Sequence, residues 1–233
     1  MRIKIVFVFL GFILLLTGYT IYYRNETLNH FLLAENPTIT DYDGNIYKTV
    51  KIGEQIWMAE NLKVTHYRNG KPIPNIYDND KWSNALTGAY CLVGNDSVDY
   101  KKTYGVLYNF NAVKNDQLCP EGWHVPTESE CMTLINYLGG KDVAGIKLKD
   151  NDSNLWSSNK SSGTNESGFS GLPAGGRGRY GSAGEVGYYA TWWSSTSYDS
   201  MYAWHWGLYP EKDGIRYNPG HKASGFSVRL IKD

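Results

Sequence analysis

Hydrophobic and polar positions alternate with a period of two in several parts of the chain. Residues 46–52 (IYKTVKI) alternate, Gly53 and Glu54 follow, and residues 55–58 (QIWM) resume the pattern. This arrangement predicts a β-hairpin with its turn at Gly53. The same alternation returns at residues 202–208 and 226–231, which predicts two further strands.

A helical period appears between these β segments. Thr127 and Glu130 have the spacing of a capping box, and a Gly pair at 139–140 favours a stop after the periodic run. The apolar residues at i, i+3, i+4 and i+7 are Cys131, Leu134, Ile135 and Leu138. A helix is therefore predicted after Thr127, and a shorter one around residues 108–114.

Residues 150–187 are rich in Gly, Ser and Asn and have little apolar periodicity, which predicts loops. Residues 25–37 form a polar stretch that ends at Asn36-Pro37. We interpret residues 25–37 as a tether and residues 38–233 as a single α+β domain. It should contain small mixed or antiparallel sheets, one or two helices and long Gly-rich loops.

The first 24 residues have a different character. Residues 5–23 carry no charge, and as a helix they would extend about 28 Å, close to the thickness of a bilayer core. The pattern Leu-Leu-Thr-Gly at 15–18 resembles the start of a lipobox, but Tyr19 stands where Cys is required. We expect residues 1–24 to be an uncleaved signal anchor through which residues 5–23 contact the membrane, with the rest facing the periplasm. The alternative is a cleaved signal peptide, which would make the protein secreted or displayed at the cell surface.

Composition and charge exclude some partners. The 233 residues include 23 basic and 23 acidic side chains, and 15% of the residues are aromatic. The charges of Arg2, Lys4 and Arg24 leave residues 25–233 with a net charge of −3. No nucleic-acid partner is expected for such a surface.

The three cysteines are Cys91, Cys119 and Cys131. In an oxidising compartment, one disulfide and one remaining thiol would be the natural arrangement. A zinc site formed by Cys119, His124 and Cys131 is a weaker alternative, because no short-spaced thiol pair accompanies them. His124, between Trp123 and Val125, is expected to be a hydrogen-bonded structural residue.

Several segments together resemble one family, the Fibrobacter succinogenes major paralogous domain of bacterial envelope proteins. The matching segments are DYDGNIY at 41–47, VKIGEQIWMAENL at 50–62, GAYC at 88–91, GVLYNFNAV at 105–113, CPEGWHVPTESE at 119–130, GFSGLPAGGR at 168–177, WSST at 193–196 and GFSVR at 225–229. They follow the order of the family and span residues 40–233.

The resemblance implies a C-type-lectin-like fold, distantly similar to formylglycine-generating-enzyme domains, in which strands from the two ends of the domain pair. It also implies a disulfide between Cys91 and Cys119. Cys131 departs from the family pattern, where Trp is usual, and its place on an apolar stripe predicts a buried free thiol. The family has no settled activity, so the resemblance implies fold and envelope location rather than chemistry.

Motifs for chemistry are weak. Residues 176–181 match GxGxxG, but no strand precedes and no helix follows, so we expect a loop in which Arg177 pairs internally. Formylglycine-generating enzymes need a Cys pair near the C-terminal region, whereas all three cysteines here precede residue 132. No cofactor is expected. The calcium-binding lectin motifs are missing from the sequence, although loop carboxylates such as Asp150, Asp152 and Asp199 could hold calcium.

The strongest indication of binding is the aromatic and polar segment 188–221. We expect its tryptophans (Trp192 or Trp193, Trp204 and Trp206) to lie in the core. The residues expected at loops or facing outward are Tyr198, Asp199, His205, Tyr209, Tyr217 and Asn218. The sequence therefore predicts a binding module for a glycan or an envelope protein, and not an enzyme. The alternatives are a structural or assembly module and, less favoured, a formylglycine-generating-type enzyme.

Overall fold

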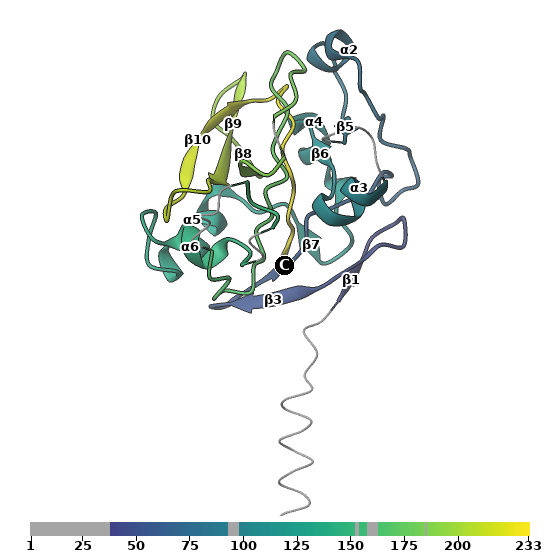
Figure 1. Ribbon diagram of the computed structural model, residues 1–233. Coiled ribbons are helices and arrows are strands. Elements are labelled where there is room, and N and C mark those ends of the chain that lie inside the picture. The colour runs from purple at the N-terminus through teal and green to yellow at the C-terminus, as the bar shows by residue number, and fades with distance from the viewer. Residues whose placement is uncertain (1–37, 93–97, 152–153, 158–162, 185) are drawn as a thin grey trace, which may run out of the picture. The chain divides into compact units, whose positions relative to one another are not determined.

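The computed structural model describes residues 38–92, 98–151, 154–157, 163–184 and 186–233 (Figure 1). The predicted apolar helix and anchor at 1–24 and the tether at 25–37 lie outside these residues. Within them, no helix combines the length and apolar character needed to cross a membrane. This part of the chain is α+β with small, mainly antiparallel sheets, as predicted, but it contains five short α-helices where one or two were expected.

The predicted hairpin is present and belongs to a four-stranded sheet. Strands β3 (Thr49–Ile52) and β4 (Gln55–Met58) pair antiparallel, and Gly53 at the turn has φ +62°, which favours glycine. Strand β11 (Ile231–Lys232) lies between β4 and β7 (Trp123–His124), so the sheet order is β3-β4-β11-β7. A smaller pair, β1 (Ile39–Thr40) and β2 (Ile46–Tyr47), precedes it.

The strand predicted at 226–231 is shorter than the alternation suggests. Only β11 is regular, and the preceding residues form isolated bridges, Phe226 with Tyr108 and Ser227 with Trp192. Side chains of both parities are buried here, including Val228 and Arg229. This segment therefore crosses the interior instead of lying on one face of a sheet.

The predicted capped helix is α5 (Glu128–Tyr137), with both halves of the Thr127–Glu130 capping box formed. It is followed by Gly139, with φ +108°, and by α6 (Ala144–Leu148). The second predicted helix is a single turn, α4 (Phe110–Val113). The remaining elements are α2 (Asn79–Ser83), β5 (Tyr90–Cys91), α3 (Val98–Tyr104), β6 (Leu107–Tyr108) and a 3₁₀ turn (Asp116–Leu118).

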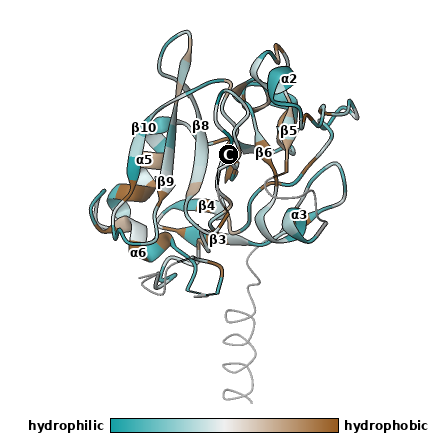
Figure 2. Ribbon diagram, turned by 45° about the horizontal axis from the view of Figure 1, so that its top comes forward, coloured by the Kyte–Doolittle hydropathy of each residue, from teal (hydrophilic) through white to brown (hydrophobic). Residues whose placement is uncertain are grey.

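A three-stranded sheet, β10-β9-β8, lies beside α5 and α6 (Figures 1 and 2). Its strands are β8 (Ala190–Ser197), β9 (Tyr202–Leu208) and β10 (Arg216–His221). Trp206 pairs with Trp192 on one side and Tyr217 on the other, so these three side chains share a face. Trp193, Ala203 and His205 lie on the opposite face by the same alternation.

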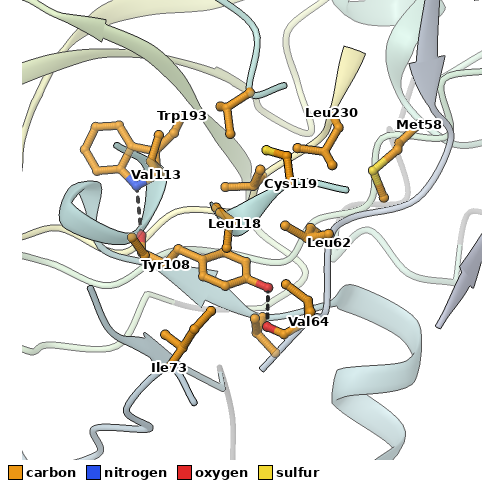
Figure 3. Close-up of a cluster of buried hydrophobic side chains, with 14 of the residues drawn as sticks. Met58, Leu62, Val64, Ile73, Tyr108, Val113, Leu118, Cys119, Trp193 and Leu230 are labelled. Atoms are coloured by element: carbon orange, nitrogen blue, oxygen red, sulfur yellow. Dashed lines mark hydrogen bonds between the residues drawn. The ribbon is translucent and has the colours of Figure 1, made fainter. Parts of the chain in front are cut away.

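Each face of this sheet packs on a core of its own. Trp192 and Trp206 join a cluster with Trp57, Phe169 and apolar residues of α5. Trp193 and Ala203 join the other cluster, with Tyr108 and Phe110. In that second group, Trp193 Nε1 donates to the Tyr108 carbonyl oxygen at 2.8 Å, and the Tyr108 hydroxyl donates to the Val64 carbonyl oxygen at 2.7 Å (Figure 3).

A buried arginine, Arg229, packs against the core on one face of the three-stranded sheet. Arg229 is 1% exposed and lies over the Phe169 ring at 4.0 Å. Asn61 Oδ1 accepts hydrogen bonds from Arg229 Nε at 2.9 Å and from Trp192 Nε1 at 2.8 Å. Burial lowers the pKa of Arg229 to about 9, so the group still carries its charge at neutral pH. Trp192 is thus fixed by a polar contact as well as by packing.

Candidate functional site

Three rings form a row at the hairpin end of the sheet. Trp204 lies between Tyr198 and Tyr217: its ring centroid is 5.2 Å from each, tilted at 85° to Tyr198 and at 30° to Tyr217. We call Tyr198, Trp204 and Tyr217 the aromatic row. Tyr198 is 56% exposed, and the other two side chains are partly exposed. The structure therefore brings two of the predicted residues, Tyr198 and Tyr217, to one surface.

Trp204 was predicted to be core and is not. Trp192, Trp193 and Trp206 are buried as predicted, but Trp204 lies nearer the β8–β9 turn, where the face is only partly covered. Alternation along a strand identifies the face of a side chain and gives no information on how far a neighbouring core extends over that face. The expectation for Trp204 was wrong for that reason, and the residue belongs to the candidate site.

The faces of the row are largely occupied by neighbouring groups. Trp204 and Tyr217 stack on each other, and the Lys141 ammonium lies 5.3 Å from the centroid of the Tyr217 ring. The Tyr217 hydroxyl is buried close to Ser194, and burial raises the pKa of Tyr217 far above its ordinary value. The row consequently offers ring edges, and the most accessible of its rings is Tyr198.

Asp199 shapes the turn beside the row. Its Oδ1 accepts hydrogen bonds from the backbone amides of Met201 and Tyr202, both at 2.7 Å. The Lys222 ammonium donates to the Asp199 carbonyl oxygen at 2.7 Å, which joins this turn to the segment after β10. Asp199 thus fixes the position of Tyr198 through the backbone.

His205 was predicted to face outward, and the structure places it on the other, covered face. Its ring stacks on Phe226 with centroids 4.6 Å apart. Burial lowers the pKa of His205 to about 4, so the imidazole is neutral at pH 7. Gly220 makes this approach possible, because a Cβ there would lie 2.8 Å from His205 Nδ1. Asn218 pairs with His205 on edge strand β10 and is exposed, as predicted.

Tyr209 lies away from the row, beyond the other end of β9. Four residues of strand separate it from Trp204, a distance of about 17 Å along the chain. It lines an open hollow of about 460 Å³. The lining residues, which we call the tyrosine hollow, are Ser157, Tyr188, Tyr209, Pro210, Glu211 and Lys212. The six predicted residues therefore do not form one site.

The predicted Cys91–Cys119 disulfide is absent from the structure, in which all three cysteines are free and buried. Cys91 packs with Trp82, Ala89 and Leu107, whereas Cys119 lies in a different cluster beside Leu118 and Leu230 (Figure 3). Separate cores hold the two thiols, so they do not pair. Cys131 is a buried free thiol, as predicted.

The environment of each thiol disfavours its ionisation. Burial raises the pKa of Cys91 to about 11 and that of Cys119 to about 12, and it raises the pKa of Cys131 well above its ordinary value. These groups stay protonated at neutral pH. A thiolate is the reactive form of cysteine, so none of the three environments suits a nucleophile or a metal ligand.

The other expected structural residues behave as predicted. Arg177, in the GxGxxG segment, donates to the backbone oxygens of Ile76, Tyr77 and Gly181. His124 hydrogen-bonds Asp233 Oδ1 at 2.5 Å and Glu130 Oε1 at 2.9 Å. Among the residues that the structure describes, no group of His, Cys, Asp and Glu side chains is arranged to hold a metal ion.

The family assignment from sequence is confirmed by comparison. The Fibrobacter succinogenes major domain matches residues 50–232, which is most of the chain, and the chain belongs to this family. No curated protein and no solved structure matches the chain.

Proposed function

We propose that this protein is an extracytoplasmic, envelope-associated binding module that performs no covalent chemistry, and that its ligand docks on the aromatic row. The observation that carries the proposal is the exposure of Tyr198 and Trp204 beside a set of fully buried tryptophans on the same sheet. Aromatic residues that remain accessible on a rigid sheet are typical of recognition surfaces.

The geometry of the row favours an envelope protein over a glycan as its ligand. A sugar stacks on the open face of an aromatic ring, but Trp204 and Tyr217 cover each other and Lys141 covers Tyr217 further. Ring edges and the exposed Tyr198 suit the core of a protein interface, where aromatic side chains are enriched.

Two further features support the wider proposal. Pairing of β11 with β4 brings the late and early parts of the domain together, in keeping with a C-type-lectin-like layout. The uncharged segment 5–23 is the basis for proposing a membrane anchor and an envelope location. The raised pKa values of the three cysteines support a module without thiol chemistry.

The test is sedimentation of the full-length protein with envelope fragments from the cells that produce it. We expect Tyr198→Ala and Trp204→Ala each to reduce co-sedimentation about tenfold, since truncation of a central aromatic residue costs about 1–2 kcal/mol or more. Tyr198→Phe should retain most binding. Tyr180→Ala is the matched control, because Tyr180 is 68% exposed and lies outside the row.

Pretreatment of the fragments identifies the ligand class. Protease treatment should abolish the part of the binding that Tyr198→Ala and Trp204→Ala remove, and periodate, which destroys sugar diols, should leave that part intact. The reverse pattern would assign a glycan to the row. Binding unchanged in both alanine variants would refute the row as the docking surface, and self-association lost in those variants would favour the structural or assembly module.

A further inference from the structure

The tyrosine hollow has the chemistry of a small-molecule site and is separate from the aromatic row. Its volume of about 460 Å³ lies within the range of ligand pockets, about 300–1,000 Å³. The wall combines two tyrosine rings and a proline with one carboxylate, one ammonium group and the hydroxyl of Ser157. Such a site has an apolar platform and a few convergent polar groups.

The two tyrosines of the hollow differ in whether a face of the ring remains accessible. Tyr209 has Tyr189 stacked on it, with centroids 6.0 Å apart and planes at 20°, and the Arg216 guanidinium 4.8 Å from its ring centroid. Tyr188 is 54% exposed, and no ring or cation of the described residues packs on it. Tyr209 therefore forms a fixed wall, whereas Tyr188 presents an accessible face.

A buried lysine fixes the rim. The Lys149 side chain is 0% exposed, and its Nζ donates to the carbonyl oxygens of Pro210 at 3.2 Å and Lys212 at 2.6 Å. Burial of an ammonium group is costly and needs compensating hydrogen bonds. Here those bonds hold the backbone on either side of Glu211, which orders the loop before any ligand arrives.

We propose that the tyrosine hollow binds a hexopyranose residue of a glycan. The C–H face of the sugar would lie on the Tyr188 ring, whose electron-rich face attracts weakly positive C–H groups. Glu211 would accept hydrogen bonds from sugar hydroxyls, and Lys212 and Ser157 would donate to them. An amphipathic ring with one apolar face and several hydroxyls fits this combination of groups.

The inference goes beyond the proposed function because different residues carry it. The row is formed by Trp204 on β9, Tyr217 on β10 and Tyr198 in the turn after β8, whereas the hollow is formed by the loop after β9 and by residues 157 and 188. Neither surface includes a residue of the other. Each can therefore be tested without altering its counterpart.

The experiment is saturation-transfer NMR on the full-length protein with methyl glycosides of glucose, galactose, mannose and N-acetylglucosamine. We expect transfer to at least one glycoside, with the affinity weakened roughly tenfold in Tyr188→Ala. Tyr188→Phe keeps the ring and should retain binding, and Tyr180→Ala is again the exposed-tyrosine control. Thermal unfolding of each variant verifies that it folds.

Lack of transfer to all four glycosides, or equal transfer in wild type and a folded Tyr188→Ala, would overturn the proposal. A folded Tyr188→Ala that loses glycoside binding but still sediments with envelope fragments would support two independent sites. Glycoside binding lost in Trp204→Ala and kept in Tyr188→Ala would place the sugar at the row and also overturn it.

Discussion

The aromatic row and the tyrosine hollow lie toward opposite ends of strand β9 and are supported in different ways. Trp204 and Tyr217 of the row project from paired strands whose centre is held between two cores, and Tyr198 lies in the turn that Asp199 fixes. The hollow is formed largely by an irregular loop that follows the strand, and hydrogen bonds from Lys149 hold this loop in place. The strands of the row are thus held mainly by packing, whereas the hollow depends on a few polar contacts.

This difference has a consequence for recognition. A surface on a packed sheet keeps its shape when a flat partner approaches, which suits association with another protein. A loop held by hydrogen bonds to its carbonyls can enclose a smaller molecule while it presents side chains of mixed polarity. The same domain can therefore offer two kinds of surface without a change in fold.

The largest expected effect is on the free energy of unfolding, and it distinguishes the buried core beside the row from the row itself. Trp206→Ala should lower the free energy of unfolding by about 3–5 kcal/mol, because it leaves a cavity beside Trp192 in the core. Trp204→Ala should lower it by only about 1 kcal/mol, because Trp204 is partly exposed. Urea denaturation of the full-length protein measures both. Equal losses would show that Trp204 is a core residue after all.

The next effect concerns the covered face behind the row. The pKa of His205 is lowered to about 4 in the folded state, against an ordinary value of about 6.5, so the unfolded chain binds the proton more tightly. The contribution of neutral His205 to the free energy of unfolding is complete above about pH 6.5. It is lost as the pH falls toward 4. Between pH 7 and 4.5 the loss should reach about 2–3 kcal/mol.

The control for this pH dependence is His205→Phe, which keeps a ring against Phe226 and cannot titrate. The difference in unfolding free energy between wild type and variant should shrink or change sign as the pH falls. A difference that stays constant from pH 7 to 4.5 would mean that His205 is solvated in the folded protein.

The smallest effect concerns the hollow alone. Lys149→Ala removes the donor to the Pro210 and Lys212 carbonyl oxygens, and each buried acceptor left unsatisfied costs about 1–3 kcal/mol. Because the loop can open to water, we expect the free energy of unfolding to fall by about 1–2 kcal/mol in total. Amide hydrogen exchange should accelerate at residues 209–213 and stay unchanged in β8 and β9. Faster exchange throughout the sheet would show that Lys149 supports the whole domain.

The regular elements could be predicted from sequence because local chemistry determines them. The Thr127–Glu130 capping box and the turn at Gly53 need only neighbouring residues, and both were predicted correctly. The disulfide depended on the resemblance and on the expected compartment. It was wrong because Cys91 and Cys119 belong to separate cores, which local sequence does not reveal.

The positions of the candidate residues in the fold were predicted only in part. Tyr198 and Tyr217 are at least partly exposed, as predicted, but Trp204 was taken for core because its alternation matches that of Trp206. Lys149 was missed because lysine is normally exposed, and nothing nearby in sequence indicates the carbonyl oxygens that it reaches. These features arise from contacts between segments far apart in the chain.

The place of β11 in its sheet also affects how the domain can fold. Ile231 pairs with Trp57 and with His124, so this sheet is completed only after residues near the end of the sequence have been made. A chain that is synthesised from its N-terminus leaves the β4 edge unpaired until then. Such distant pairing slows folding and leaves an open strand edge that is prone to aggregation. We therefore expect the domain to gain its full stability in a late step of folding.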